Sequence, residues 1–216
     1  MKKYDLILFD LDGTLTNPER GLVEGFVYAF RKAGIDFGTR ESLKRFIGPP
    51  LFEEWQKVFG FTPEESAETI RIFREYYDVY GWWDNRPYDG IHELLSELKR
   101  SGKRLGVATS KPEDTAKRVL NLFGLTRYFD FVGGALRSTA RDKKSDVISY
   151  VLDSLGVEGK ENVVLIGDRK FDAEGAAEVG IDSIGVLWGH GSKEELSLAS
   201  FKKIVSSPEE LVDILI

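Results

Sequence analysis

Cysteine is absent from this chain of 216 residues, methionine occurs once, and histidine occurs twice. The lack of cysteine excludes disulfide bonds, thiol catalysis and cysteine-ligated zinc, and two histidines argue against a histidine-rich metal site. No apolar run approaches the roughly 20 residues that a membrane-spanning helix needs. The first strand-like run begins at Leu6, which leaves no room for a signal peptide. We therefore expect a cytoplasmic protein with no membrane partner.

Positive charge is also in short supply. The chain has 30 lysines and arginines against 36 aspartates and glutamates, a net charge of −6, which argues against nucleic acid as a partner. The hydrophobic content of 42% is ordinary for a globular protein. The length suits either one large domain or a core with an insertion, and the composition leaves open whether the protein is a monomer or a homodimer.

The most informative motif follows the first apolar run. Residues 6–9 (Leu-Ile-Leu-Phe) predict a buried strand, and Asp10-Leu11-Asp12-Gly13-Thr14 comes directly after it. Many Asp-Gly pairs are only turns, and an EF-hand fits poorly because Gly13 stands at position 4 instead of 6. Clustered carboxylates are costly to bury without a compensating cation. Magnesium suits them, and beside a metal one carboxylate can act as nucleophile and the other as general acid/base.

Other strand-like runs also end in polar residues. Residues 163–166 are followed by Asp168, with Asp172 four residues further on, and residues 105–108 are followed by Thr109 and Ser110. Carboxyl ends of parallel strands meet at one edge of a sheet, where α/β proteins place their sites. Lys143 or Lys144, at the start of a helix-patterned segment, could add a cation. Together these are the parts of a metal-assisted phosphoryl-transfer site.

The order of the patterns indicates two parts. From about residue 18 to 85 no strand pattern occurs, and the spacing of apolar residues predicts helices, one of them opened by a capping box at Thr62–Glu65. Strands predicted at 104–109, 128–132, 163–167 and 183–187 alternate with helices, which favours a parallel sheet. A second capping box is predicted at Ser207–Glu210. We expect an α/β core at 1–17 and 86–216, with a helical subdomain inserted at 18–85.

On these residues the chain resembles the haloacid dehalogenase-like hydrolases. Asp10–Thr14, Thr109, a lysine near 144, and Gly167-Asp168 with Asp172 look like the four motifs of that superfamily in order and spacing. The chain looks most similar to its phosphoglycolate phosphatase-like branch, whose members carry an inserted helical cap. The resemblance implies an α/β fold with a Rossmann-like parallel sheet, helices on both faces, and an all-helical cap.

The resemblance also implies roles for individual residues. Asp10 would be the nucleophile that forms an aspartyl-phosphate and also a metal ligand, and Asp12 would be the acid/base whose backbone carbonyl ligates magnesium. Thr109 and Lys144 would bind phosphate. Asp168 would be a metal ligand, with Asp172 at or next to the metal site.

Several assignments stay open. Lys143 and Lys144 are adjacent candidates, and Lys144 is preferred because the sequence from it onward fits a helix start better. Ser110 either shares the role of Thr109 or caps the next helix. Arg169 and Lys170 are either substrate contacts or solvated loop charges. Arg45 is a candidate for substrate selection in the cap, with a surface arginine beside a helix break as the alternative.

The expected function is hydrolysis of small phosphate monoesters with Mg²⁺ as cofactor and a small phosphorylated metabolite as partner. The alternatives are a 5'-nucleotidase-type phosphatase, a phosphomutase of the β-phosphoglucomutase type, and a phosphate-binding interaction protein without activity. Aromatic residues of the helical block, such as Trp55, could stack on a nucleobase, but aromatic residues at helical spacing usually pack a core.

Overall fold

The computed structural model describes residues 4–137 and 141–216, and the chain divides into two compact units. One unit comprises Met1–Asn17 and Pro87–Ile216, and the other comprises Pro18–Arg86. Two short strands, β2 (Thr16–Asn17) and β3 (Arg86–Pro87), pair with each other where the chain leaves the first unit and returns to it. The second unit is therefore an insertion whose two ends lie side by side.

The first unit is built on a six-stranded sheet in the order β5-β4-β1-β6-β7-β8. Its strands are β1 (Leu6–Phe9), β4 (Arg104–Pro112), β5 (Phe131–Ala135), β6 (Val163–Gly167), β7 (Asp182–Val186) and β8 (Lys203–Val205). All neighbouring strands run parallel. The central strand β1 is buried along its whole length, as expected for an unbroken apolar run in a sheet covered on both faces.

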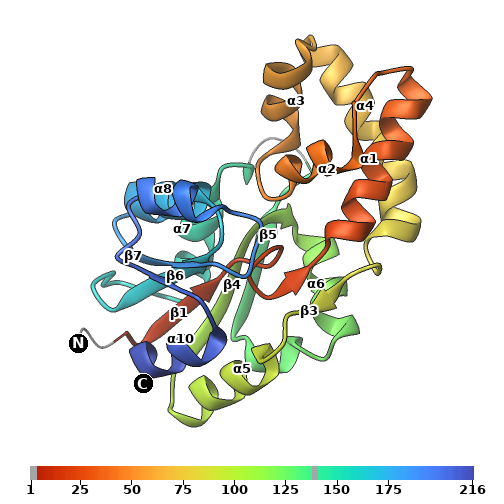
Figure 1. The fold of residues 1–216 in the computed structure, drawn as a ribbon. Coiled ribbons are helices and arrows are strands. Elements are labelled where there is room, and N and C mark those ends of the chain that lie inside the picture. The colour runs from red at the N-terminus through yellow and green to blue at the C-terminus, as the bar shows by residue number, and fades with distance from the viewer. Residues whose placement is uncertain (1–3, 138–140) are drawn as a thin grey trace. The chain divides into compact units, whose positions relative to one another are not determined.

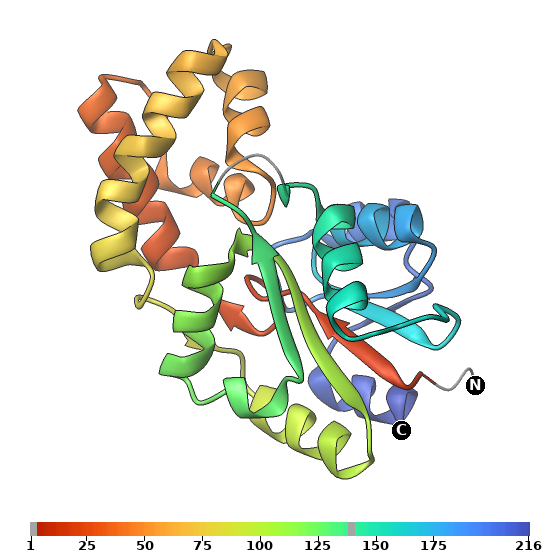
Figure 2. The same ribbon diagram turned by 180° about the vertical axis from the view of Figure 1, so that it is seen from behind.

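Helices cover both faces of this sheet (Figures 1 and 2). On one face α7 (Lys144–Ser154) and α8 (Lys170–Val179) pack together, and a core that includes Leu8, Val151 and Leu165 lies beneath them. On the other face lie α5 (Ile91–Arg100), α6 (Glu113–Leu122) and α10 (Pro208–Leu215). A short helix, α9 (Lys193–Leu198), follows β7. The predicted α/β fold with a parallel sheet is confirmed.

Three details of the sequence prediction are corrected. Strand β5 begins at Phe131, not 128, because Thr126–Tyr128 form a 3-10 turn. Strand β8 was not predicted. At the start of α10 the capping box does not form, because Glu210 accepts a hydrogen bond from the backbone N–H of Ser206, and the Ser207 side chain caps no backbone group.

The inserted unit is helical and has its own aromatic core. Its elements are α1 (Glu19–Ala33), α2 (Arg40–Leu43), a 3-10 turn at Lys44–Phe46, α3 (Leu51–Phe59), α4 (Pro63–Tyr76) and a π-helical turn at Tyr77–Gly81. Trp55 is fully buried, with its ring centroid 5.0 Å from that of Phe30 and 5.9 Å from that of Phe26. The interpretation of Trp55 as a core residue is confirmed. Within the described residues, no helix has the length and apolarity to cross a membrane.

Candidate active site

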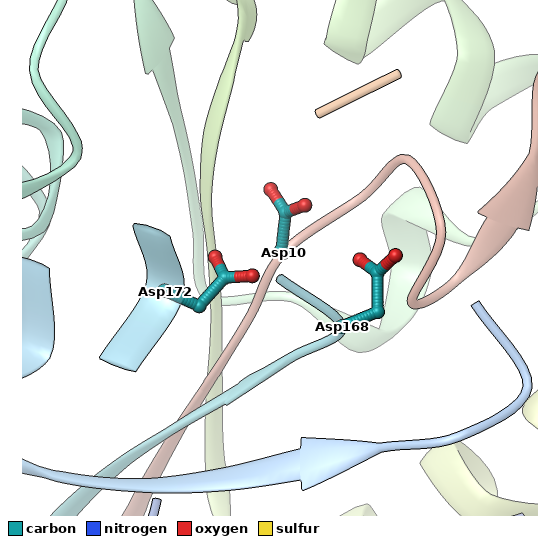
Figure 3. A group of neighbouring side chains, drawn as sticks. All are labelled: Asp10, Asp168 and Asp172. Carbon is teal, nitrogen blue, oxygen red and sulfur yellow. The ribbon is translucent and has the colours of Figure 1, made fainter. Parts of the chain in front are cut away.

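Three aspartates meet at the carboxyl ends of the central strands (Figure 3). Asp10 follows β1, Asp168 follows β6, and Asp172 lies in the first turn of α8. Each offers a carboxylate oxygen within 4.8 Å of the others, and all three residues are buried. Because β1 and β6 are parallel neighbours, with Phe9 opposite Ile166, the residues that follow both strands emerge at the same edge of the sheet.

Lys144 supplies the cation of this cluster. Its Nζ lies 2.8 Å from Oδ1 of Asp10 and 2.7 Å from Oδ1 of Asp172, and the residue is buried, whereas Lys143 is exposed. Of the two adjacent candidates, Lys144 is thus the one that the fold brings to the aspartates. Burial alone would lower the pKa of Lys144, but the charges of Asp10 and Asp172 outweigh burial and raise it, so the ammonium form persists.

Asp168 is held at both carboxylate oxygens. The hydroxyl of Thr14 donates to Oδ1 at 3.2 Å, and the backbone N–H of His190 donates to Oδ2 at 2.8 Å. The indole N–H of Trp188 in turn donates to the backbone carbonyl of Thr14 at 3.0 Å. Burial raises the pKa of Asp168 well above its ordinary value, and the charges of Asp172 and Asp10 act in the same direction. Sequence reasoning assigned no role to the loop at 188–191 that contributes these contacts.

Two glycines make room for the Asp168 side chain. Gly13 has a φ of +88°, in the region that favours glycine, and a Cβ added there would overlap the Asp168 carboxylate. A Cβ at Gly189 would overlap Cβ and Oδ2 of the same aspartate. The backbones of two loops therefore lie in close contact with the Asp168 side chain, and no larger residue fits at position 13 or 189 without movement.

Asp12 is not one of the three clustered carboxylates, although the charges of Asp10 and Lys144 act on it, and it has a partner of its own. The chain turns at Leu11, whose carbonyl accepts hydrogen bonds from three backbone N–H groups, so the strand does not continue as an extended segment to Asp12. Lys111 Nζ lies 2.6 Å from Oδ2 of Asp12, and the lysine side chain is only 3% exposed. Burial raises the pKa of Asp12, although Lys111 acts to lower it. Lys111 was not predicted, and its only signal was a lysine at the end of an apolar strand.

The other predicted residues have varied surroundings. Thr109 is buried in β4 and its hydroxyl accepts from the backbone N–H of Lys111 at 3.3 Å, while Ser110 is half-buried beside it. Arg169 pairs through Nε with Oε1 of Glu195 at 2.9 Å, so its charge is balanced within the unit. Arg45 belongs to the helical unit, where it is exposed and its guanidinium lies 4.9 Å from the centroid of the Phe46 ring.

The charge balance of the cluster indicates what it can hold. Among the described residues, the ion pairs of these three buried carboxylates are made by one ammonium group, that of Lys144, so the cluster carries an excess of negative charge when all three are ionised. Such a group is stable only with a bound cation or with protons, in keeping with the raised pKa values of Asp168 and Asp172, both caused chiefly by burial. The donors are all oxygen atoms, which hard divalent cations prefer. The residues present therefore fit a divalent metal ion.

Comparisons with known proteins agree with this chemistry. A family model for haloacid dehalogenase-like hydrolases matches residues 7–186. A 5'-nucleotidase from Pseudomonas aeruginosa is 40% identical over 194 residues, which cover 90% of this chain and 87% of that protein. The tyrosine-protein kinase PtkA of Mycobacterium tuberculosis is 38% identical over 195 residues, 90% of this chain and 66% of the kinase.

A crystal structure described as a predicted phosphatase from Clostridium acetobutylicum matches with a TM-score of 0.95 and 39% identity, and covers 99% of this chain and 98% of that one. The resemblance inferred from the four motifs is thus confirmed. The chain belongs to the haloacid dehalogenase-like hydrolases, and it is a phosphatase of that family.

Proposed function

We propose that this enzyme is a magnesium-dependent phosphatase of small phosphate monoesters that works through an aspartyl-phosphate on Asp10. The observation that carries the proposal is the buried group of Asp10, Asp168 and Asp172, two of which, Asp10 and Asp172, pair with Lys144. The carboxylates of these aspartates, with the backbone carbonyl of Asp12, would hold the magnesium ion. When bound, the ion would neutralise charge on the phosphoryl oxygens.

The side chains then divide the chemistry among themselves. A carboxylate oxygen of Asp10 attacks phosphorus, the bond to the leaving oxygen breaks, and that oxygen takes a proton from Asp12. Asp12, now ionised, removes a proton from water, which hydrolyses the aspartyl-phosphate and frees Asp10. The raised pKa of Asp12 supports its part as the proton donor, because burial favours the protonated form. Lys144, Thr109 and Ser110 bind the phosphoryl oxygens.

Two substrate classes are favoured within this proposal. Phosphoglycolate-like monoesters follow from the motif resemblance. Nucleoside 5'-monophosphates are the second candidate, because the relative named 5'-nucleotidase is 40% identical over 90% of this chain. We assign the choice between leaving groups to the helical unit, Pro18–Arg86, because it contributes none of the clustered aspartates or lysines.

Release of phosphate from p-nitrophenyl phosphate tests the reaction. Enzyme dialysed against EDTA should be inactive, and magnesium should restore turnover. Asp10→Asn should abolish turnover and keep the fold, because an amide cannot form the acyl-phosphate. Asp153→Asn, an exposed aspartate in α7, is the matched control and should behave like the wild type. Full activity after EDTA dialysis, or near-normal activity of Asp10→Asn, would refute the proposal.

A further inference from the structure

Arg141 lies three residues before Lys144 and makes three contacts with one side chain that is only 14% exposed. Its Nε donates to the backbone carbonyl of Gly134 at 2.9 Å, and its Nη2 donates to Oε2 of Glu113 at 2.7 Å. The guanidinium carbon lies 3.6 Å from the centroid of the Tyr150 ring. The guanidinium thus combines an ion pair, a backbone hydrogen bond and a ring contact.

The three contacts reach three different elements. Gly134 belongs to β5, Glu113 is the first residue of α6, and Tyr150 lies in α7. The β5 contact is tight, because a Cβ added to Gly134 would lie 2.6 Å from both Cα of Glu113 and the carbonyl oxygen of Lys111. Arg141 therefore connects the helix that begins with Lys144 to the end of the strand that carries Thr109 and Lys111.

The start of α7 has no side-chain cap. Lys143 occupies the N-cap position and makes no capping hydrogen bond, although the first turn of a helix leaves backbone N–H groups that a cap normally satisfies. Lys144 carries a long side chain with four rotatable bonds, and its Nζ must stay within 3 Å of both Asp10 and Asp172. Lys144 packs closely on α8, where a Cβ added to Gly175 would lie 2.8 Å from Cβ of the lysine, and Arg141 links the same end of α7 to β5 and α6.

We propose that Arg141 is a positioning residue for Lys144: its guanidinium holds the beginning of α7 against β5 and α6, and so keeps the Lys144 ammonium at the phosphoryl-binding site. The inference rests on the proposed function, in which Lys144 binds the phosphoryl group. The planar fork of arginine suits the position, because it bonds two acceptors in its plane while its face covers the Tyr150 ring. Lysine offers the charge without that geometry.

Calorimetric titration with inorganic phosphate in magnesium-containing buffer tests the inference. The binding stoichiometry reports the folded fraction, and the Kd reports the affinity of the folded protein, so a variant that merely folds poorly loses stoichiometry at unchanged Kd. Arg141→Met should weaken the Kd by roughly tenfold, because small displacements of a charged binding group are costly. Arg141→Lys should weaken it severalfold, and Tyr150→Phe, which keeps the ring, should match the wild type.

Arg104 provides the matched control. Its Nη2 donates to the backbone carbonyl of Leu155 at 2.7 Å, so Arg104→Met also loses an arginine–carbonyl bond, but at the first residue of β4, away from the strand ends that carry the aspartates. Its Kd should be that of the wild type. An unchanged Kd in Arg141→Met, an equal loss in Arg104→Met, or a wild type that does not bind phosphate would overturn the inference. If Arg141→Met fails to fold, Arg141→Lys takes its place: a severalfold weaker Kd supports the inference, and an unchanged Kd overturns it.

Turnover of p-nitrophenyl phosphate by the wild type is a separate readout. A wild type that binds phosphate in an Arg141-dependent way and hydrolyses no ester would refute the proposed function and leave the positioning role standing. If the wild type hydrolyses the ester and Arg141→Met retains full phosphate affinity, the proposed function stands and the positioning role of Arg141 is refuted.

Discussion

At the scale of single residues, the absence of a side chain at Gly189 is as much a part of the site as the aspartate it faces. Gly189→Ala would place a Cβ inside Asp168, so either the loop or the aspartate must move. We expect the free energy of unfolding to fall by about 1–3 kcal/mol, the usual effect of overpacking, and magnesium binding to weaken as well. Denaturant unfolding and metal titration measure the two effects.

Gly159→Ala is the control for this substitution. A Cβ there would approach only the end of the exposed Glu161 side chain, which is free to rotate away. Its stability should stay within about 0.5 kcal/mol of the wild type, as for most surface substitutions. If Gly189→Ala were equally mild, the close packing of the 188–191 loop on Asp168 would not be needed.

A second residue-scale prediction concerns alkaline pH. The Tyr4 hydroxyl donates to Oδ2 of Asp182 at 2.9 Å. Burial, then this hydrogen bond and the charge of Asp182, raise the pKa of Tyr4 from 10.0 to about 12. Between those pH values the folded protein keeps a proton that the unfolded chain loses, so the contribution of Tyr4 to stability is complete below pH 10 and falls as pH rises.

Denaturant unfolding across this pH window measures that loss. Tyr4→Phe should show a shallower fall in the free energy of unfolding, because it has no phenolic proton to lose. An identical slope in Tyr4→Phe and wild type would contradict the assignment to Tyr4.

Residue-level prediction from the sequence succeeded where backbone topology decides proximity. Asp10 and Asp168 were expected to meet because both follow apolar strands, and the structure brings them together. The pairing of Asp12 with Lys111 was not foreseeable in the same way. It depends on the turn at Leu11 and on the direction of a long side chain, and neither has a periodic signature.

At the scale of elements, the two predicted capping boxes can be compared directly, because the one at α4 forms and the one at α10 does not. At α4 the Thr62 hydroxyl accepts from the N–H of Glu65 at 3.2 Å, and the Glu65 carboxylate accepts from the N–H of Thr62 at 2.8 Å. Thr62→Ala should lower the free energy of unfolding by about 1 kcal/mol. Ser207→Ala, at a position with the same sequence signature and no capping bond, should change it by only a few tenths.

Tryptophan fluorescence during denaturant unfolding measures the first effect, since three of the four tryptophans (Trp55, Trp82 and Trp83) lie in the helical unit. Equal losses in the two variants would mean that helix propensity, not capping, determines the difference from the wild type.

The success of element prediction depended on length. The four-residue run of β1 and the five-residue run of β6 are continuous and apolar, and they were predicted at their observed positions. Strand β8 has three residues, and its first two, Lys203 and Ile204, are exposed and half-buried. A segment this short and polar shows no periodic pattern of apolar residues, and only its pairing with β7 identifies it as a strand.

At the scale of the whole molecule, the proposed function assigns the chemistry to one unit and the choice of substrate to the other. If Arg45 pairs with a carboxylate or second phosphate of the substrate, Arg45→Ala should lower kcat/KM for such anionic substrates by roughly 10–100-fold, the loss of a charge-assisted hydrogen bond. Hydrolysis of p-nitrophenyl phosphate, which has no second anionic group, should change little.

Arg31 is an exposed arginine at the end of α1, and Arg31→Ala serves as the control. It should change kcat/KM for neither the anionic substrates nor p-nitrophenyl phosphate. Parallel losses of kcat/KM on both substrates in Arg45→Ala would assign Arg45 to the folding of the helical unit, and selection would then have to come from other residues.

The central place of β1 has a consequence for how the chain is made. Strand β1, the first of the described strands, pairs with β4 and β6, which begin at Arg104 and Val163, so it has no partner in this sheet until β4 has been synthesised. The helical unit, by contrast, is complete once Arg86 has emerged and can fold while the first strand waits. The nascent protein therefore carries an unpaired apolar strand until β4 has been made, and its cluster of three aspartates closes only when Asp172 arrives.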